Sequence, residues 1–265
     1  MPSSRILRDR VAGQSAMSDV IRAQAEAPAR TLTRRILGFS PLTAASRRSY
    51  RSALGELLVG TVLGDLGPRW DVLHDLPLRE SVLDHLLIGP AGVFAVSAAN
   101  CGGDEVIIDG ETLVVAGQRG GDIGMADAQA REVEHILTRA VGETVRVRPL
   151  LVIVNPKRLA VKSHPSAVRV IESAELERVL TRTAATMTGD EVARVSDLAD
   201  LDATWPRGVA VDPEDTQQLH RDFGTIRGEV RVSLGRRTLW TLAALGVVCG
   251  VIWALTATLA LRVVG

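Results

Sequence analysis

The chain has 265 residues, and its 31 basic and 31 acidic side chains give a formal net charge of zero at pH 7. Apolar residues make up 46% of the chain and charged residues 23%, which allows a buried core and excludes a wholly disordered chain. A chain with zero net charge is not expected to coat nucleic acid through overall electrostatic attraction. Two cysteines, Cys101 and Cys249, are too few for a disulfide framework or a cysteine-rich zinc site.

Residues 1–46 are predicted to be a basic N-terminal arm. Residues 1–51 contain ten arginines against three acidic residues, a net charge of 10 − 3 = +7. The stretch 17–37 has apolar residues at helical spacing and is interrupted by Pro28. Two interpretations remain open: a basic amphipathic segment that lies on anionic lipid or phosphate, and a solvated, partly disordered arm.

Residues 47–184 have the pattern of a folded α/β domain. A helix with apolar positions three and four apart is expected first, and Gly67-Pro68 ends it. The strands expected after it are 70–78, 82–89, 93–98, a hairpin over 105–115, 145–154 and 167–171, and the helices are 125–141 and 173–183. This order predicts a mixed sheet flanked by helices.

The last part of the chain reads as a membrane anchor. Residues 185–237 are expected to be weak helix and linker ending in a basic juxtamembrane segment, and 238–262 a transmembrane helix. Residues 239–261 carry no charge, and such a helix would span roughly 35 Å, enough for a hydrocarbon core of about 30 Å. Trp240 lies where an interfacial anchor would.

Flanking charge predicts the orientation of this helix. Residues 221–237 hold five arginines against two acids, whereas only Arg262 follows the apolar run. The positive-inside rule then keeps the N-terminal domain in the cytoplasm. No apolar run of signal-peptide length occurs in residues 1–20, so we expect a tail-anchored, single-pass protein of the cell membrane.

A family resemblance is carried by Gly55-Glu56 in the first helix of the domain and by the run VLDHLLIGPAGVFAV from Val82 to Val96. It continues through Asn100 and Gln129-Ala130. Over roughly residues 48–180 the chain resembles the nuclease-related domain (NERD) family of the PD-(D/E)xK nuclease superfamily. The resemblance implies an α/β, restriction-endonuclease-like mixed sheet flanked by helices, here followed by one C-terminal transmembrane helix.

The resemblance also implies a metal-dependent site made of a helix glutamate, a strand aspartate and a Glu-x-Lys pair on the next strand. Glu56 and Asp84 match the first two positions, but the pair falls on Ser97 and Ala99. Loss of one such stabilising group commonly costs about two to three orders of magnitude in rate, so we expect an inactive site. Whether Glu56 and Asp84 still hold a weakly bound magnesium ion, or no cofactor, stays open.

We therefore expect a membrane-tethered, catalytically inactive nuclease-related domain that binds nucleic acid, such as DNA, or a protein partner. The alternative is an active divalent-metal-dependent nuclease with migrated site residues, for which Glu80, Asp104 and Glu105 are the nearby acids. Self-association through the transmembrane helix is a third reading, because Gly246-x-x-x-Gly250 has the spacing of helix dimers.

Overall fold

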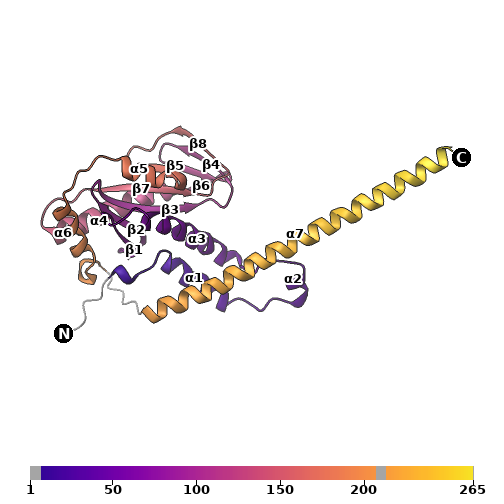
Figure 1. Cartoon of the computed structure of the whole chain (residues 1–265), viewed down its shortest axis with the longest axis horizontal. Helices are drawn as coiled ribbons and strands as arrows, with labels where there is room; N and C mark the ends of the chain where they lie inside the picture. Colours follow the sequence, from indigo (N-terminus) through magenta and orange to yellow (C-terminus); the bar gives the residue numbers. More distant parts are fainter. Residues whose placement is uncertain (1–6, 207–212, 265) are drawn as a thin grey trace.

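The computed structural model describes residues 7–206 and 213–264, and within the C-terminal helix it describes the side chains of residues 215–253. The chain folds into an α/β domain from which one long helix extends (Figure 1). The predicted mixed α/β class is confirmed, with two mixed sheets where one was expected.

The central sheet has five strands in the order β1-β2-β3-β7-β9. The first three are antiparallel neighbours, whereas β7 pairs parallel with both β3 and β9. Their bounds are β1 Asp71–Pro77, β2 Val82–Gly89, β3 Gly92–Asn100, β7 Val147–Val154 and β9 Arg169–Glu172. Strand β7 is apolar on both faces because helices cover both sides of the sheet.

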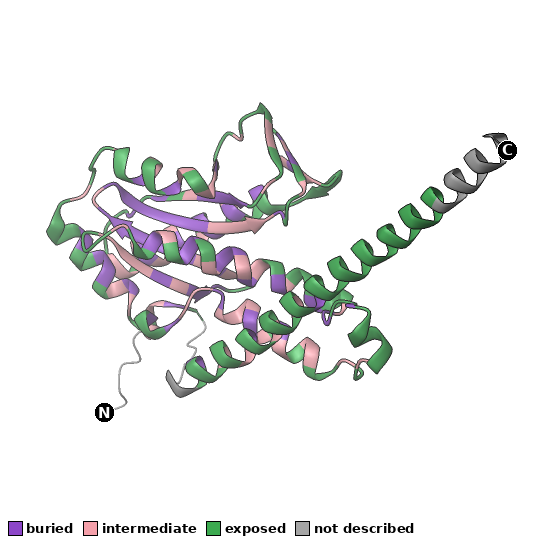
Figure 2. Cartoon of the chain, turned by 45° about the vertical axis from the view of Figure 1, so that its right-hand side comes forward, coloured by how far each residue is buried: buried purple, intermediate pink, exposed green. Residues whose placement is uncertain are grey.

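Helices α3 (Ala44–Gly64) and α5 (Leu176–Arg182) cover one face of the central sheet. Helices α4 (Asp122–Val141) and α6 (Gly189–Ala199) cover the other. Burial is concentrated between these layers (Figure 2). Helix α3 begins with a capping box, in which the Thr43 hydroxyl accepts from the Ser46 amide and the Ser46 hydroxyl accepts from the Thr43 amide.

A second sheet has four strands in the order β6-β5-β4-β8. The predicted hairpin supplies β4 (Glu105–Asp109) and β5 (Thr112–Val115). The sequence did not predict β6 (Gln118–Gly120) or β8 (Arg158–Ser163), whose residues are largely exposed and lack an alternating apolar pattern. Apolar residues of β4 and β5 pack on the first turns of α4 and on β7, so the small sheet extends the main domain.

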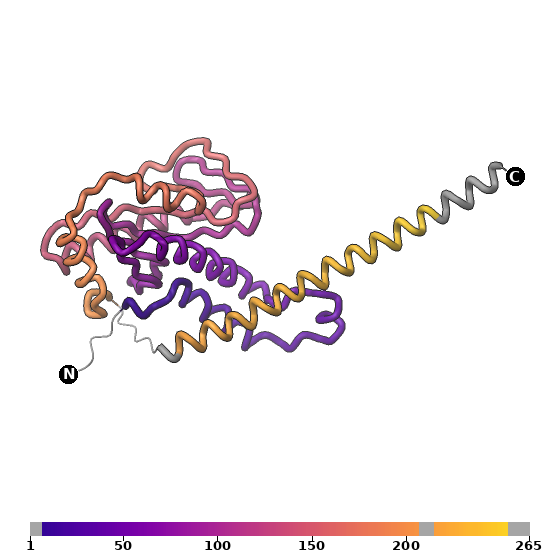
Figure 3. The backbone as a smooth tube through the Cα atoms, viewed as in Figure 1, coloured from indigo at the N-terminus to yellow at the C-terminus, as the bar shows by residue number. Residues whose placement is uncertain are grey.

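The N-terminal segment differs from the solvated arm that was one of its two interpretations. From Leu7, a short 3-10 turn η1 (Leu7–Asp9) leads into α1 (Gln14–Ala25), which lies between α3 and the C-terminal helix (Figure 3). Met17 and Val20 are fully buried there. Sequence periodicity marked the apolar positions of α1, but their partners on α3 and α7 lie far along the chain.

The C-terminal helix α7 (Pro213–Val264) includes much of the stretch expected to be weak helix and linker. Its first half packs on the domain through Phe223, whose ring lies 5.6 Å from that of Tyr50. Among the described residues it is the one helix long and apolar enough to cross a membrane, and its apolar window is not buried. Gly246 and Gly250 have no atom within 4 Å of an added Cβ.

Candidate functional site

The carboxyl group of Glu56 lies on the inner face of α3. The side chain is buried and accepts a hydrogen bond of 2.9 Å from the hydroxyl of Ser52, one turn earlier. Burial raises the pKa of Glu56 to about 7, the bond from Ser52 opposes that shift, and the charge of Asp75 adds to it.

Asp84 lies where β2 and β3 diverge. Their pairing runs from Gly89 opposite Gly92 down to His85 opposite Val96 and stops there. In place of a further ladder bond, the Ala98 amide donates to Asp84 Oδ2 at 2.7 Å. Burial and the neighbouring Glu56 raise the pKa of Asp84 well above its ordinary value, against the effect of the Ala98 bond. The structure therefore brings the two predicted acids together.

A third carboxyl, Asp75 on β1, joins this pair and was missed from the sequence. It is fully buried, with a left-handed backbone (φ 56°). Its carboxylate accepts from the guanidinium of Arg10, and from the amide and hydroxyl of Ser15 at 2.8 and 2.9 Å. Arg10 is itself only 5% exposed. No local pattern could have linked Arg10 to Asp75, because 65 residues separate them.

Ser97 and Ala99, at the Glu-x-Lys positions, are on β3 and face α4. The Ser97 hydroxyl donates to Gln129 Oε1 at 3.0 Å, and Gln129 Nε2 donates to the Val82 carbonyl at 2.9 Å. Ala99 packs beside the apolar cluster of the small sheet. These two positions therefore offer a hydroxyl already bonded to an amide, and a methyl group.

Glu56 and Asp84 are the two carboxylates available to a magnesium ion at these positions. Magnesium in proteins keeps several water ligands beside its one or two carboxylates, whereas Glu56 is buried and Asp84 is half-buried with its Oδ2 bonded to the Ala98 amide. Across the described parts of the chain, no group of three or more histidine, cysteine, aspartate or glutamate side chains is arranged to hold a metal.

Of the three acids considered as migrated ligands, two form ion pairs with other side chains and the third is exposed. Asp104 forms an ion pair of 3.6 Å with Arg51, and Glu105 lies 4.0 Å from Lys157. Glu80 is exposed in the turn between β1 and β2. The structure therefore does not assemble them around Glu56 and Asp84.

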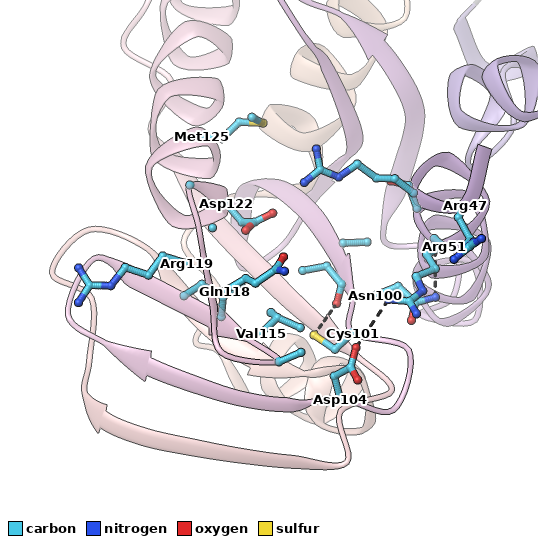
Figure 4. Close-up of a pocket in the computed structure, with 18 of the residues that line it drawn as sticks. Arg47, Arg51, Asn100, Cys101, Asp104, Val115, Gln118, Arg119, Asp122 and Met125 are labelled. Atoms are coloured by element: carbon cyan, nitrogen blue, oxygen red, sulfur yellow. Dashed lines mark hydrogen bonds and ion pairs between the residues drawn. The ribbon is translucent and has the colours of Figure 1, made fainter. Parts of the chain in front are cut away.

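A cleft of about 850 Å³ opens beside these positions, between the first turns of α3, the end of β3 and the small sheet (Figure 4). Four arginines and two acids line it: Arg47, Arg48, Arg51, Arg119, Asp104 and Asp122. Ser52, Ala98 and Ala99 also line it, whereas the described lining residues include neither Glu56 nor Asp84. The cleft thus reaches Ala99, whereas Ser97, Glu56 and Asp84 are not among its lining residues.

The thiol of Cys101 also lines the cleft but is not activated. The residue is buried, and its sulfur lies 3.6 Å from the Ala99 carbonyl. Burial, with Asp122 and Asp104, raises the pKa of Cys101 to about 11, so the inert thiol is favoured over the nucleophilic thiolate.

Residues 51–154 match the family model of the nuclease-related domain. This part of the chain is similar to the nuclease-related domain family. The match begins in α3 and ends with β7, so it includes Glu56, Asp84, Ser97, Ala99 and Gln129. Comparisons with curated proteins and with solved structures each gave no significant match. The N-terminal segment that contributes Arg10, and the long helix α7, lie outside the matched residues of the nuclease-related domain.

Proposed function

We propose that this chain is a membrane-anchored nuclease-related domain that binds the phosphate backbone of nucleic acid without cutting it. The observation that carries the proposal is the arginine-lined cleft, whose lining includes Ala98 and Ala99 but neither of the two acids. A phosphate held there would meet no metal ligand and no lysine at the Glu-x-Lys positions.

The charge of the cleft supports phosphate as the ligand. Arg47, Arg48 and Arg119 are exposed and form no ion pair among the described residues, whereas Arg51 is paired with Asp104. Guanidinium groups suit phosphate because their planar donors match its oxygens in pairs. The local excess, four arginines against two acids, exists although the whole chain is neutral.

In this proposal α7 is the membrane anchor, and it would place the domain beside the cytoplasmic face of the cell membrane. The charge-free run, the preceding arginines and the interfacial position of Trp240 support that placement. The span would be single, with the nuclease-related domain on the arginine-rich side.

The test measures the affinity of the full chain, in detergent, for labelled single- and double-stranded DNA over a salt series. Each phosphate contact contributes roughly 0.9 to the slope of log K against log salt on duplex DNA, so three free arginines predict a slope of roughly −3. Arg47→Gln/Arg48→Gln should weaken binding about tenfold or more and reduce the slope by about 2.

The matched control is Arg178→Gln/Arg182→Gln, which removes two exposed arginines from α5, outside the cleft. It should leave both affinity and slope unchanged. If the natural chain has no affinity at low salt, the nucleic-acid proposal is wrong, and a protein ligand becomes the better hypothesis for this domain.

A further inference from the structure

A short loop beside α7 exposes large apolar side chains to solvent. It comprises residues 30–40 and includes α2 (Leu32–Ile36); we call it the α2 loop. The exposed fractions are 74% for Leu32, 56% for Ile36, 46% for Leu37 and 54% for Phe39. Four such side chains within eight positions, none packed on the domain, form an unpartnered apolar surface.

The α2 loop is fixed to α7 at one level of that helix. The Trp240 indole donates to the Ile36 carbonyl at 2.9 Å, and Arg236 Nη1 donates to the Arg35 carbonyl at 3.0 Å. Gly38 (φ +74°) touches the backbone of α7, since a Cβ there would lie 2.5 Å from the Arg237 nitrogen. Only glycine allows this approach without displacing one of the two segments.

This level is the boundary between the charged and the apolar parts of α7. Arg236 and Arg237 are the last charges before the charge-free run that begins at Leu239. Tryptophan is enriched where a membrane helix meets the headgroups, because its ring is apolar and its N–H is polar. The α2 loop is bonded to Trp240, so it lies at headgroup depth if α7 spans a bilayer.

The charge around the loop is also suited to a membrane surface. Between residues 27 and 55 there are six arginines and no acid. Arg30 forms an ion pair with Glu229. Arg34 and Arg35 are exposed among the apolar side chains, and the guanidinium carbon of Arg34 lies 5.8 Å from the centroid of the Phe39 ring. Apolar side chains interleaved with arginines are the composition of segments that lie in the interface of anionic bilayers.

We propose that the α2 loop inserts its apolar side chains into the leaflet on the side of the domain, while its arginines contact anionic lipid phosphates. The inference rests on the proposed membrane span of α7. The loop would give the domain a second attachment to the membrane. It would also fix the height and tilt of the domain above the bilayer, because α2 is bonded to α7 and the first half of α7 packs on α1 and α3.

The test places a spin label at Phe39→Cys, Ile252→Cys or Glu177→Cys in the full chain, with Cys101 and Cys249 replaced by alanine. The protein is reconstituted in vesicles of equal parts phosphatidylcholine and phosphatidylglycerol. Collision with oxygen reports the bilayer, and collision with a water-soluble nickel chelate reports water. The labels at Phe39 and Ile252 should be oxygen-accessible and protected from nickel, whereas Glu177, exposed on α5, should be nickel-accessible.

These labels separate the two hypotheses. A Phe39 label in water while the Ile252 label is in the bilayer overturns the α2-loop proposal and keeps the membrane span. Both labels in water overturn the span itself.

Two matched double substitutions test the role of the arginines in the α2 loop. Arg34→Glu/Arg35→Glu should shift the Phe39 label toward water in the anionic vesicles, and Arg178→Glu/Arg182→Glu on α5 should not. An equal effect of both pairs, or of neither, would contradict a specific contact between the α2 loop and lipid phosphate.

Discussion

Glu56 shows how burial changes the chemistry of a single residue. Its carboxyl is buried on α3, close enough to Asp84 and Asp75 for their charges to act on each other. A buried carboxylate beside other carboxylates is destabilised, so the protonated form is favoured. Arg10 compensates Asp75 directly, and removal of one partner of such a buried pair commonly costs about 3–5 kcal/mol.

The raised pKa of Glu56, about 7, predicts a pH dependence of stability. Because the folded state holds the proton more tightly than the unfolded state, this stabilisation is complete below the unfolded pKa and is lost as pH rises through about 7. Between about pH 6 and about pH 8 the contribution of Glu56 to the unfolding free energy should fall by about 1 to 1.5 kcal/mol. Burial lowers the pKa of His74 to about 4 and that of His85 well below its ordinary value. In the unfolded state both rings bind protons below their ordinary pKa of about 6.5, so they contribute a dependence of the opposite sign, and the Glu56 contribution is read from the difference between variants.

Glu56→Gln should remove the Glu56 contribution, so that its change in unfolding free energy between the two pH values differs from that of the natural chain by about 1 to 1.5 kcal/mol, as measured by denaturant unfolding of the full chain in detergent. Glu177→Gln, an exposed glutamate on α5, is the control and should retain the change of the natural chain. Equal changes in the natural chain and in Glu56→Gln would show that Glu56 titrates in its ordinary range.

At the scale of elements, the domain depends on a close contact between α3 and the N-terminal segment. An added Cβ at Gly60 of α3 would lie 2.6 Å from the Cβ of Ala12, nearer than packed side chains approach. The same helix has Gly64, where an added Cβ meets nothing within 4 Å. A side chain would therefore clash at Gly60 but would have room at Gly64, one turn later.

This contrast gives a matched pair of substitutions. Gly60→Ala should destabilise the fold by about 1–3 kcal/mol, because the segment around Ala12 must move away from α3. Gly64→Ala should be neutral or should stabilise by up to about 1 kcal/mol, because alanine favours the helix and has room. Equal unfolding free energies for the two variants would contradict the packing of the N-terminal segment on α3.

Local pattern predicted most elements of the central sheet, and the reason is their burial. Strands such as β2 and β7 are apolar runs between turn residues, so periodicity and glycine-proline signals mark them. Strand β8 could not be found in this way, because its pattern is mostly exposed and it is stabilised by pairing with β4, about 50 residues earlier. The position of α1 likewise depends on contacts with α7, at the other end of the chain, and local pattern does not show it.

The candidate site was predictable only in part. Glu56, Asp84, Ser97 and Ala99 could be placed from a motif, because the resemblance gives their positions along the chain. The contribution of Arg10 and Asp75, and the cleft formed by Arg47, Arg48 and Arg119 from different elements, arises from tertiary contacts. Such groupings leave no spacing signal in one sequence.

At the scale of the whole molecule, three features occur together: a domain similar to the nuclease-related family, an arginine-lined cleft and a helix long and apolar enough to cross a membrane. The first half of α7 packs on α1 and α3, so this candidate membrane helix is continuous with a helix that contacts the domain. A ligand bound in the cleft would thereby be retained at the bilayer.

The most direct measurement incubates the full chain in detergent with labelled single- and double-stranded DNA and with magnesium or manganese, and follows both retention and cleavage. Asp84→Asn and Ser97→Glu/Ala99→Lys run beside it. We expect the natural chain to retain DNA and leave it intact, and Asp84→Asn to do the same. Cleavage by the natural chain that Asp84→Asn abolishes would contradict this expectation and establish an active nuclease with relocated ligands.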